Sequence, residues 1–453
     1  MKNAWMVGIA AGVLLSGAVG QLRAQTLEEA LVSAYLTNTD LEAQRAALRA
    51  TDELVPQALS DWRPTLAIDS TAAYADVDSS QGGGSLGTVG SSVILDQDLY
   101  NGGETVANTS RAENLVRLER ARLQAIEQQV LLDAVTAYTD LLSAQAVLDF
   151  ARQNEDRLQR QLQATRDRFE VGEVTRTDVA QAEASLSGAV ASRVQAEGQV
   201  QAAEAAYRQV INQEPIKLMR PPPLMALPGT QAEAQELAQA FNPNITAGQY
   251  DLAASRADVD VASATLLPRL SLQGELGYTE NPSVELDWQS VGQIGANLTI
   301  PLYQGGGEYA RVRQTKQTVR QREDDLESVF RSVRQDVTDS WQALTSARTA
   351  LESFRDQVRA AEIAVEGTRQ EALVGQRTTL DVLDQEQDLF QAQVDLVNAA
   401  RDEIIASYRL KAAVGELTAT GIGLPVEPYN PEAHYEQVRN KLFGLGPDID
   451  DRD

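Results

Sequence analysis

Aspartates recur along one stretch of the chain at intervals that place them on one face of a helix. Asp381, Asp384 and Asp388 stand at positions i, i+3 and i+7, and Asp395 and Asp402 continue the same stripe. Like charges on one helix face repel by roughly 0.2–0.5 kcal/mol per pair. Rings of such carboxylates around a pore favour cations and can gate it, and Asp388, Asp395 and Asp402 would then line the lumen. For an isolated helix, the simpler interpretation is a solvated outer face.

The composition leaves few residue types for catalysis or metal binding. The chain has no cysteine and one histidine, His434, which excludes disulfides, cysteine nucleophiles, His-based triads and multi-His metal sites. No acidic pair stands in a pocket-forming context. A net charge of −26 disfavours nucleic acid, because an acidic surface repels phosphates. We therefore expect no catalytic residue, no cofactor, no metal site and no nucleic-acid partner.

Residues 1–24 are typical of a secretory signal peptide. Lys2 supplies a positive start, an apolar run covers residues 5–19, and small residues follow at Gly20 and Ala24. Cleavage is expected near Ala24, with Gly20 as the second candidate. The apolar run is shorter than the ~20 residues that a membrane-spanning helix needs. We expect an exported mature protein rather than one held by a helical anchor.

The rest of the chain consists of two copies of one sequence unit. The sequence LYNGG at 99–103 recurs as LYQGG at 302–306, and VGEVTRTDV at 171–179 recurs as VGQRTTLDV at 374–382. Both recurrences lie 203 residues further along the chain. Landmarks that keep their order at one offset predict an internal duplication.

The duplication divides the mature chain into four segments. They are a first repeat at 25–220, a proline-rich linker at 221–230, a second repeat at 231–417 and an acidic tail at 418–453. Proline cannot continue a helix, so the linker separates the repeats. Each repeat contains a helix, two strands, a very long helix and a shorter returning helix. The tail is expected to be mobile or to lie around the equator of the molecule.

Alternating apolar and polar residues predict two strands in each repeat. The strands are expected at 65–77, 86–100, 269–279 and 288–303, and glycine-rich residues 81–87 are expected to be the loop between the first two. One apolar and one polar face suit a transmembrane β-barrel. A small soluble sheet is the alternative, but the flanking helices are too long to close a globular core around it.

Four strands cannot close a barrel, and an open sheet edge cannot lie in lipid. Two chains would give eight strands, whose interior is filled by side chains. Three chains give twelve strands and room for a lumen. A homotrimer is therefore the smallest conducting assembly that the strands predict.

The last helix of the second repeat has two apolar seams instead of one. They are Leu380, Leu383, Phe390, Val394, Val397, Ile404 and Tyr408, and Val382, Leu389, Ala392, Leu396, Ala399 and Ala406. Two seams require a helical neighbour on each side, as in the wall of a tube. The other helices are expected at about 27–60, 104–170, 232–266 and 308–373, with the returning helices ending near 211 and 414.

A secreted coiled-coil structural protein, such as an adhesin stalk, is the alternative to an outer-membrane duct. It accounts for the long helices. It does not predict four amphipathic strands at matching places in two repeats, which a membrane channel does.

Two segments resemble a known family. Residues 374–415, which begin VGQRTTLDVLDQ, are similar to the C-terminal signature of the TolC family of outer-membrane channel proteins, and 169–186 resemble its first-half counterpart. TLEEAL at 26–31 and WRPTL at 62–66 fit the family's start and first strand. The resemblance implies a mixed α and β membrane protein, a homotrimer whose twelve-stranded outer-membrane barrel continues into an α-helical barrel across the periplasm.

The same resemblance implies partners and site residues. The partners are a periplasmic adaptor protein and an inner-membrane ABC or proton-driven transporter, and drug efflux and type I protein secretion both stay open. Asp381 and Asp384 match the aspartate rings that narrow the periplasmic mouth. Arg377 matches the arginine that latches the closed mouth to the first helix pair, and Thr177 and Asp178 match its partners.

Overall fold

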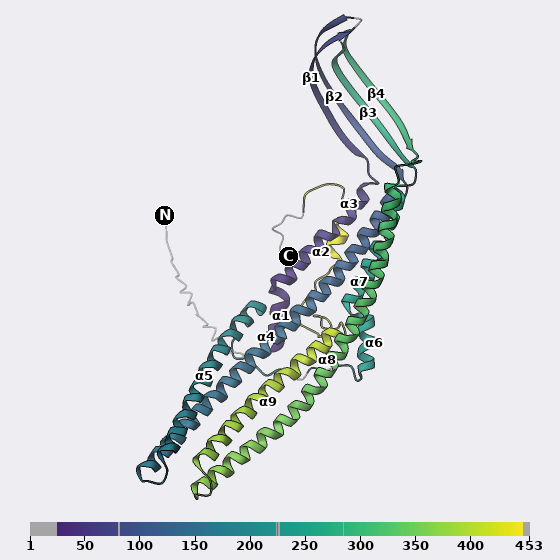
Figure 1. Ribbon diagram of the computed structural model, residues 1–453. Helices are drawn as coiled ribbons and strands as arrows, with labels where there is room; N and C mark the ends of the chain where they lie inside the picture. Colours follow the sequence, from purple (N-terminus) through teal and green to yellow (C-terminus); the bar gives the residue numbers. More distant parts are fainter. Residues whose placement is uncertain (1–24, 80–81, 223, 225–226, 284, 447–453) are drawn as a thin grey trace, which may run out of the picture.

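The computed structural model describes residues 25–79, 82–222, 224, 227–283 and 285–446. The predicted signal peptide at 1–24 lies outside these residues. The molecule is elongated, with one β-sheet at one end and long helices that run away from it (Figure 1). None of the helices in the described ranges is both long and apolar enough to span a membrane.

The sheet has four antiparallel strands in the order β1-β2-β3-β4, and its two faces differ in polarity. Cross-strand partners share a face, and one face carries the pairs Leu66–Leu95 and Val93–Leu276. The other face carries polar pairs. One is Gln293–Glu275, in which Gln293 Nε2 donates to Glu275 Oε2 at 2.6 Å. The strands are β1 Thr65–Ser79, β2 Gly82–Asn101, β3 Arg269–Ser283 and β4 Leu286–Thr299. The apolar face is exposed, with Ile68 at 73% and Ile294 at 76%, as expected of a surface that contacts lipid.

Three predicted strand boundaries are wrong, the first being that of β3, which runs to Ser283 rather than to 279. Residues 82–87 belong to β2 and are not a loop, because the glycine backbones continue the ladder: Gly84 pairs with Val77 and Gly83 with Asp78. β4 ends at Thr299 rather than near residue 303. Pro301 follows closely, and proline has no N–H to donate to a ladder.

The predicted single helices at 27–60 and 232–266 are also wrong, because each is interrupted at an asparagine. Asn38 Oδ1 accepts hydrogen bonds from the N–H groups of Asp40 and Leu41 and so caps a new helix. Asn242 does the same ahead of Pro243, a residue suited to the first helical position. The resulting helices are α1 Leu27–Thr37, α2 Thr39–Asp52 and α3 Leu54–Ser60 in the first case, and α6 Gln231–Phe241 and α7 Pro243–Ala264 in the second.

The long helices form two hairpins that lead away from the sheet. They are α4 Glu104–Glu170 with α5 Arg176–Ile211, and α8 Gly307–Leu373 with α9 Thr379–Ala413. At 67 residues each, α4 and α8 span about 100 Å. Both hairpin turns lie at the end of the molecule remote from the strands (Figure 1).

The two seams of α9 have helical neighbours on both sides, as predicted, since α9 contacts α8 and also α4. Leu383 and Phe390 pack into apolar clusters with residues of α4 and α5. Ala406 and Leu410 pack against Val333 and other residues of α8. The α9 helix therefore joins the two hairpins into one continuous wall.

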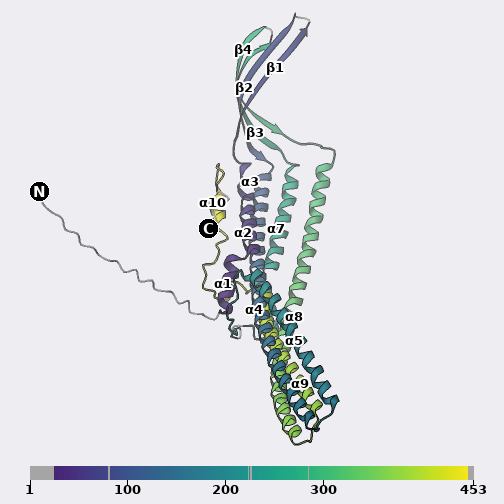
Figure 2. The same ribbon diagram turned by 90° about the vertical axis from the view of Figure 1, so that its left-hand side faces the viewer.

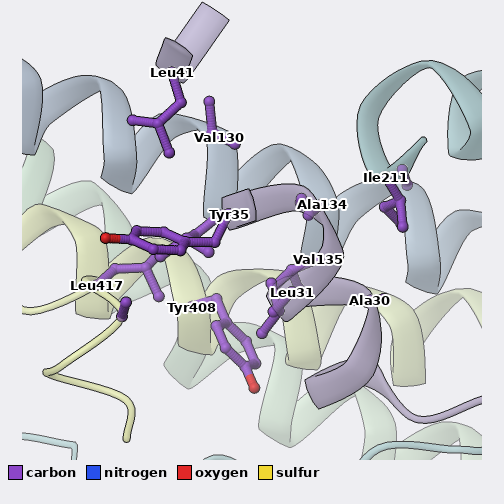
Figure 3. Packing of buried hydrophobic residues seen from close by; sticks show 14 of the residues in the cluster. Ala30, Leu31, Tyr35, Leu41, Val130, Ala134, Val135, Ile211, Tyr408 and Leu417 are labelled. Atoms are coloured by element: carbon purple, nitrogen blue, oxygen red, sulfur yellow. The ribbon is translucent and has the colours of Figure 1, made fainter. Parts of the chain in front are cut away.

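The main apolar core lies around the middle of the molecule, where α1, α4, α9 and the segment after α9 meet (Figure 3). Tyr35, Val135, Tyr408 and Leu417 come from these four parts. The tail adds its own apolar residues to this core, namely Ile422, Leu424, Val426, Tyr429 and Tyr435. The expectation of a mobile tail is therefore wrong for its described part.

Polar contacts also attach the tail to the first helices. The tail's short helix α10, Ala433–Val438, contacts α2 (Figure 2). His434 Nδ1 lies 3.1 Å from Asp52 Oδ2, and Arg439 Nη2 donates to Glu113 Oε1 at 3.2 Å. The sequence alternative of an equatorial segment fits this arrangement.

A glycine just after α9 provides a test of how closely the end of this helix packs against the corner between α6 and α7. Gly415 has φ +91°, and a Cβ there would overlap the backbone of Phe241 and Asn242. Gly423 also has a positive φ, +69°, but a Cβ there would meet nothing within 4 Å. We expect Gly423→Ala to cost about 1–2 kcal/mol of unfolding free energy and Gly415→Ala roughly 3–5 kcal/mol. Denaturant unfolding followed by circular dichroism would measure both, and equal losses would contradict the close packing of α9 on the α6–α7 corner.

Candidate functional site

The two hairpin turns are built in the same way. Each long helix ends at a glycine in the left-handed region, Gly172 with φ +81° and Gly375 with φ +77°. In each turn the glycine and the following residue donate backbone hydrogen bonds back to the helix end, which satisfies carbonyls that would otherwise be unpaired. The repeated VG motifs of the sequence are thus the turns themselves.

Reciprocal caps begin both returning helices. Thr378 Oγ1 accepts from the Asp381 N–H at 3.2 Å, and Asp381 Oδ2 accepts from the Thr378 N–H and hydroxyl, each at 2.8 Å. Thr175 and Asp178 repeat this arrangement. These hydrogen bonds hold the pKa of both carboxyl groups below its usual range. Asp381 is therefore an ionised helix cap in addition to any role at the mouth.

The structure does not bring Arg377 to its predicted latch partners within one chain. Arg377 Nε donates to Glu371 Oε2 at 2.9 Å across its own turn, which raises the pKa of the guanidinium. The Asp178 carboxylate already accepts a hydrogen bond from the Thr175 hydroxyl, and Thr177 is exposed. The latch between Arg377 and the other turn therefore stays a prediction about the assembled protein.

The aspartate stripe runs along α9 into a groove. Asp384 and Asp388 are exposed near the turn. Asp395 and Asp402 line a groove of about 690 Å³, between residues of α4 and of α8. Arg401 lies in the same groove, 2.8 Å from Asp402 and 3.5 Å from Asp140 of α4. Burial raises the pKa of Asp140, and the charge of Arg401 opposes that rise.

The groove and the apolar core occupy different sides of α9. Ile404 and Tyr408 point into the core that α1 and the tail cover, whereas Asp402 and Arg409 line the groove. One side of the helical wall is thus covered by the equatorial segments, and the polar stripe lies on the uncovered side.

A buried ion cluster joins the hairpins, and the sequence analysis did not identify it. Glu386 of α9 has a side chain only 3% exposed; Oε2 lies 2.7 Å from Arg157 Nε of α4, and Oε1 pairs with Arg369 Nη2 of α8. One carboxylate therefore links three helices and both repeats. Its sequence signal is a glutamate set between the apolar pairs Val382–Leu383 and Leu389–Phe390.

Comparisons with known proteins establish the family. A family model described as outer membrane efflux protein matches residues 30–213 and 235–416. The chain belongs to the outer membrane efflux protein family. It is 37% identical over 441 residues to the outer membrane efflux protein BepC of Brucella suis, covering 96% of both chains. It is 30% identical to the outer membrane protein TolC of Vibrio cholerae, over 90% of this chain and 95% of that one.

Solved structures show the same fold for this efflux-family protein. The CmeC outer membrane channel of Campylobacter jejuni superposes with a TM-score of 0.78 at 15% identity, over 91% of this chain and 89% of that one. VceC of Vibrio cholerae gives a TM-score of 0.75 at 18% identity, over 86% and 96% of the two chains. The predicted TolC-family membership is confirmed, and with it an outer-membrane exit duct that extends into the periplasm. The alternative of a secreted stalk is wrong.

The Glu386 cluster yields a prediction for this family member. Removing one partner of a buried ion pair costs roughly 3 kcal/mol because the remaining charge is left uncompensated. Glu386→Ala should therefore speed amide exchange in the parts of α8 and α9 near their hairpin turn by roughly 100-fold. The control is Glu366→Ala, because Glu366 pairs with the same Arg369 at 3.7 Å but is 62% exposed. Hydrogen exchange with mass spectrometry compares the two, and equal effects would contradict a linking role for Glu386.

Proposed function

We propose that three copies of this chain close one continuous duct through the outer membrane and the periplasm. The observation that supports the proposal is the pair of open sheet edges, because within the described residues β1 pairs only with β2 and β4 only with β3. Unpaired backbone groups in lipid cost several kcal/mol each. Pairing β1 of one copy with β4 of the next would remove every edge. The same threefold closure would place twelve long helices in the periplasmic wall.

The duct would be passive, without a catalytic step, and would receive its substrate from partner proteins. We propose a periplasmic adaptor that meets the hairpin turns and an inner-membrane ABC or proton-driven transporter that supplies energy. Val171, Leu373 and Val374 are 72%, 75% and 71% exposed at these turns. Apolar side chains gathered at the remote end of the molecule suit contact with a partner.

Export of small toxic compounds is the first candidate function. The relative named as an efflux protein, BepC, matches nearly the whole chain. Deleting the gene from its bacterium should raise sensitivity to dyes, detergents and antibiotics, and a plasmid copy should restore resistance. Unchanged sensitivity to every compound tested would contradict the efflux proposal.

Type I protein secretion is the second candidate. The alkaline protease secretion protein AprF of Pseudomonas aeruginosa is 27% identical over 69% of this chain. In the same deletion strain, loss of a secreted protein from the medium with unchanged drug sensitivity would favour this candidate over efflux.

We further propose that Asp381 and Asp384 ring the periplasmic mouth in the trimer. Their stripe lies on the side of α9 that the equatorial segments leave uncovered, which is the side that would face the lumen. The proposed latch joins Arg377 of one chain to Thr177 and Asp178 of a neighbouring chain. Opening would then require Arg377 to exchange between that latch and Glu371 in its own turn.

Removing the two charges at the mouth should weaken cation selectivity and block by multivalent cations. The variant is Asp381→Asn with Asp384→Asn, because asparagine keeps a hydrogen-bond acceptor for the helix cap. Planar bilayer recordings measure selectivity and block. The control is Asp258→Asn, which removes one charge from an exposed ion pair with Arg111 on other helices. Selectivity that changes equally in both variants would place the stripe outside the lumen.

Breaking the latch should open the mouth. Charge-assisted hydrogen bonds contribute about 1.5–3 kcal/mol when partly shielded and less when exposed. Arg377→Ser should raise single-channel conductance, and Asp178→Ala should raise it partially. The double variant should fall short of additivity, because both substitutions remove one interaction. Wild-type conductance in Arg377→Ser, with the assembly intact, would show that this turn is not the latch.

A further inference from the structure

The described end of the tail exposes three large apolar side chains within four residues. Leu442, Phe443 and Leu445 are 70%, 89% and 102% exposed. The preceding part of the tail behaves differently, because Val438 is only 1% exposed against the helices. Single exposed apolar residues are common, but a cluster of them marks a contact surface.

A hydrogen bond places this cluster beside the start of the sheet. Arg63 Nη1 donates to the carbonyl oxygen of Lys441 at 2.8 Å. Arg63 comes two residues before β1, and Leu442 directly follows Lys441. Consecutive Cα atoms are about 3.8 Å apart, so the Cα atoms of Leu442 and Phe443 lie within about 8 Å of that of Lys441. Figure 1 shows the chain after α10 rising beside α3 toward the strands.

Aromatic residues indicate that this level is the membrane surface. Trp62, Tyr100 and Tyr303 are 45%, 46% and 79% exposed close to the sheet's helical end. At the other end, Tyr278 and Trp288 stack with ring centroids 6.3 Å apart. Trp and Tyr gather at both surfaces of a bilayer.

The separation of the two aromatic levels fits the height of a bilayer's apolar band. Tyr100 pairs with Leu270, and Trp288 pairs with Glu280. The ten steps from Leu270 to Glu280 along β3 span about 33 Å, or about 25 Å at a tilt near 40°, which is the height of the lipid-facing band of such barrels. The apolar cluster of the tail therefore stands where the sheet's apolar face begins.

The charge of the segment also suits a phospholipid surface. Residues 438–446 contain two basic residues and no acidic one, in a chain with a net charge of −26. Arg439 pairs with Glu113 of α4, so Lys441 is the cation of this segment that stands beside the exposed apolar side chains. Arg63 adds a second cation at the same place. Basic residues next to exposed Leu and Phe are typical of segments that bind at the membrane surface, because lipid phosphates attract them.

We propose that residues 439–446 form an interfacial anchor that inserts Leu442, Phe443 and Leu445 into the periplasmic leaflet of the outer membrane beside the barrel. The anchor would fix the equatorial tail to the membrane and hold the helical wall at a set distance from it. This role goes beyond the proposed duct and does not depend on what the duct exports.

Spin labelling can test the anchor directly, because the chain has no cysteine and any introduced thiol is unique. The full-length protein would carry a nitroxide at Phe443→Cys or, independently, at Leu445→Cys. It would be reconstituted in vesicles of phosphatidylethanolamine and phosphatidylglycerol. Collision with oxygen, which concentrates in lipid, is compared with collision with a water-soluble nickel chelate. Leu298→Cys on the apolar face of β4 and Gln437→Cys at an exposed position of α10 are the lipid and water controls.

We expect residues 443 and 445 to resemble residue 298, with oxygen collisions exceeding nickel collisions several-fold, and residue 437 to show the reverse. Nickel accessibility equal to that of residue 437 would mean that the segment lies in water. Protection from both reagents would mean that it packs on a neighbouring protein chain. Either result would overturn the anchor, while a lipid signal at residue 298 would leave the outer-membrane duct standing.

Discussion

Backbone N–H and C=O groups at the two edges of the sheet have no partner strand within the described chain, and lipid offers them none. This unmet hydrogen bonding is a constraint on how the whole chain can be arranged in the membrane. The apolar face of the strands requires a bilayer, and a bilayer requires a closed barrel. Four strands cannot close one, and this is why we propose that several copies of the chain share one barrel.

The arrangement of the strands also determines the arrangement of the helices, because a glycine pair links each strand region to the long helix that follows. Gly102–Gly103 and Gly305–Gly306 turn the chain directly into α4 and α8, so the spacing of the strands sets the spacing of the helices. Each helix in a ring needs a neighbour on both sides, and α9 has two apolar seams for that purpose. Glu386 adds an ionic link across the same wall, which makes relative movement of the hairpins energetically costly.

Much of the fold was predictable from the sequence, because the period of apolar residues shows which side of a strand or helix is covered by a neighbour or by lipid. The strand alternation, the two seams of α9 and the matching turn motifs all followed from residue spacing. The breaks at Asn38 and Asn242 did not, because a side-chain cap competes with helix propensity at a single position. The strand at 82–87 was missed because glycine has no side chain to show alternation. The partners of Arg377 and Glu386 depend on which helices lie together, and no local pattern carries that information.

The mass of the purified, membrane-competent protein shows directly whether several chains share one barrel. Native mass spectrometry of the full-length protein, released from detergent or nanodiscs, counts the chains in each particle. Conductance in planar bilayers shows that the same preparation is competent. Closure of one barrel by three chains predicts particles of three chains in every conducting preparation. A conducting preparation made of single chains would contradict this prediction. The edge strands of a single four-stranded sheet would then have backbone groups without hydrogen-bond partners in lipid.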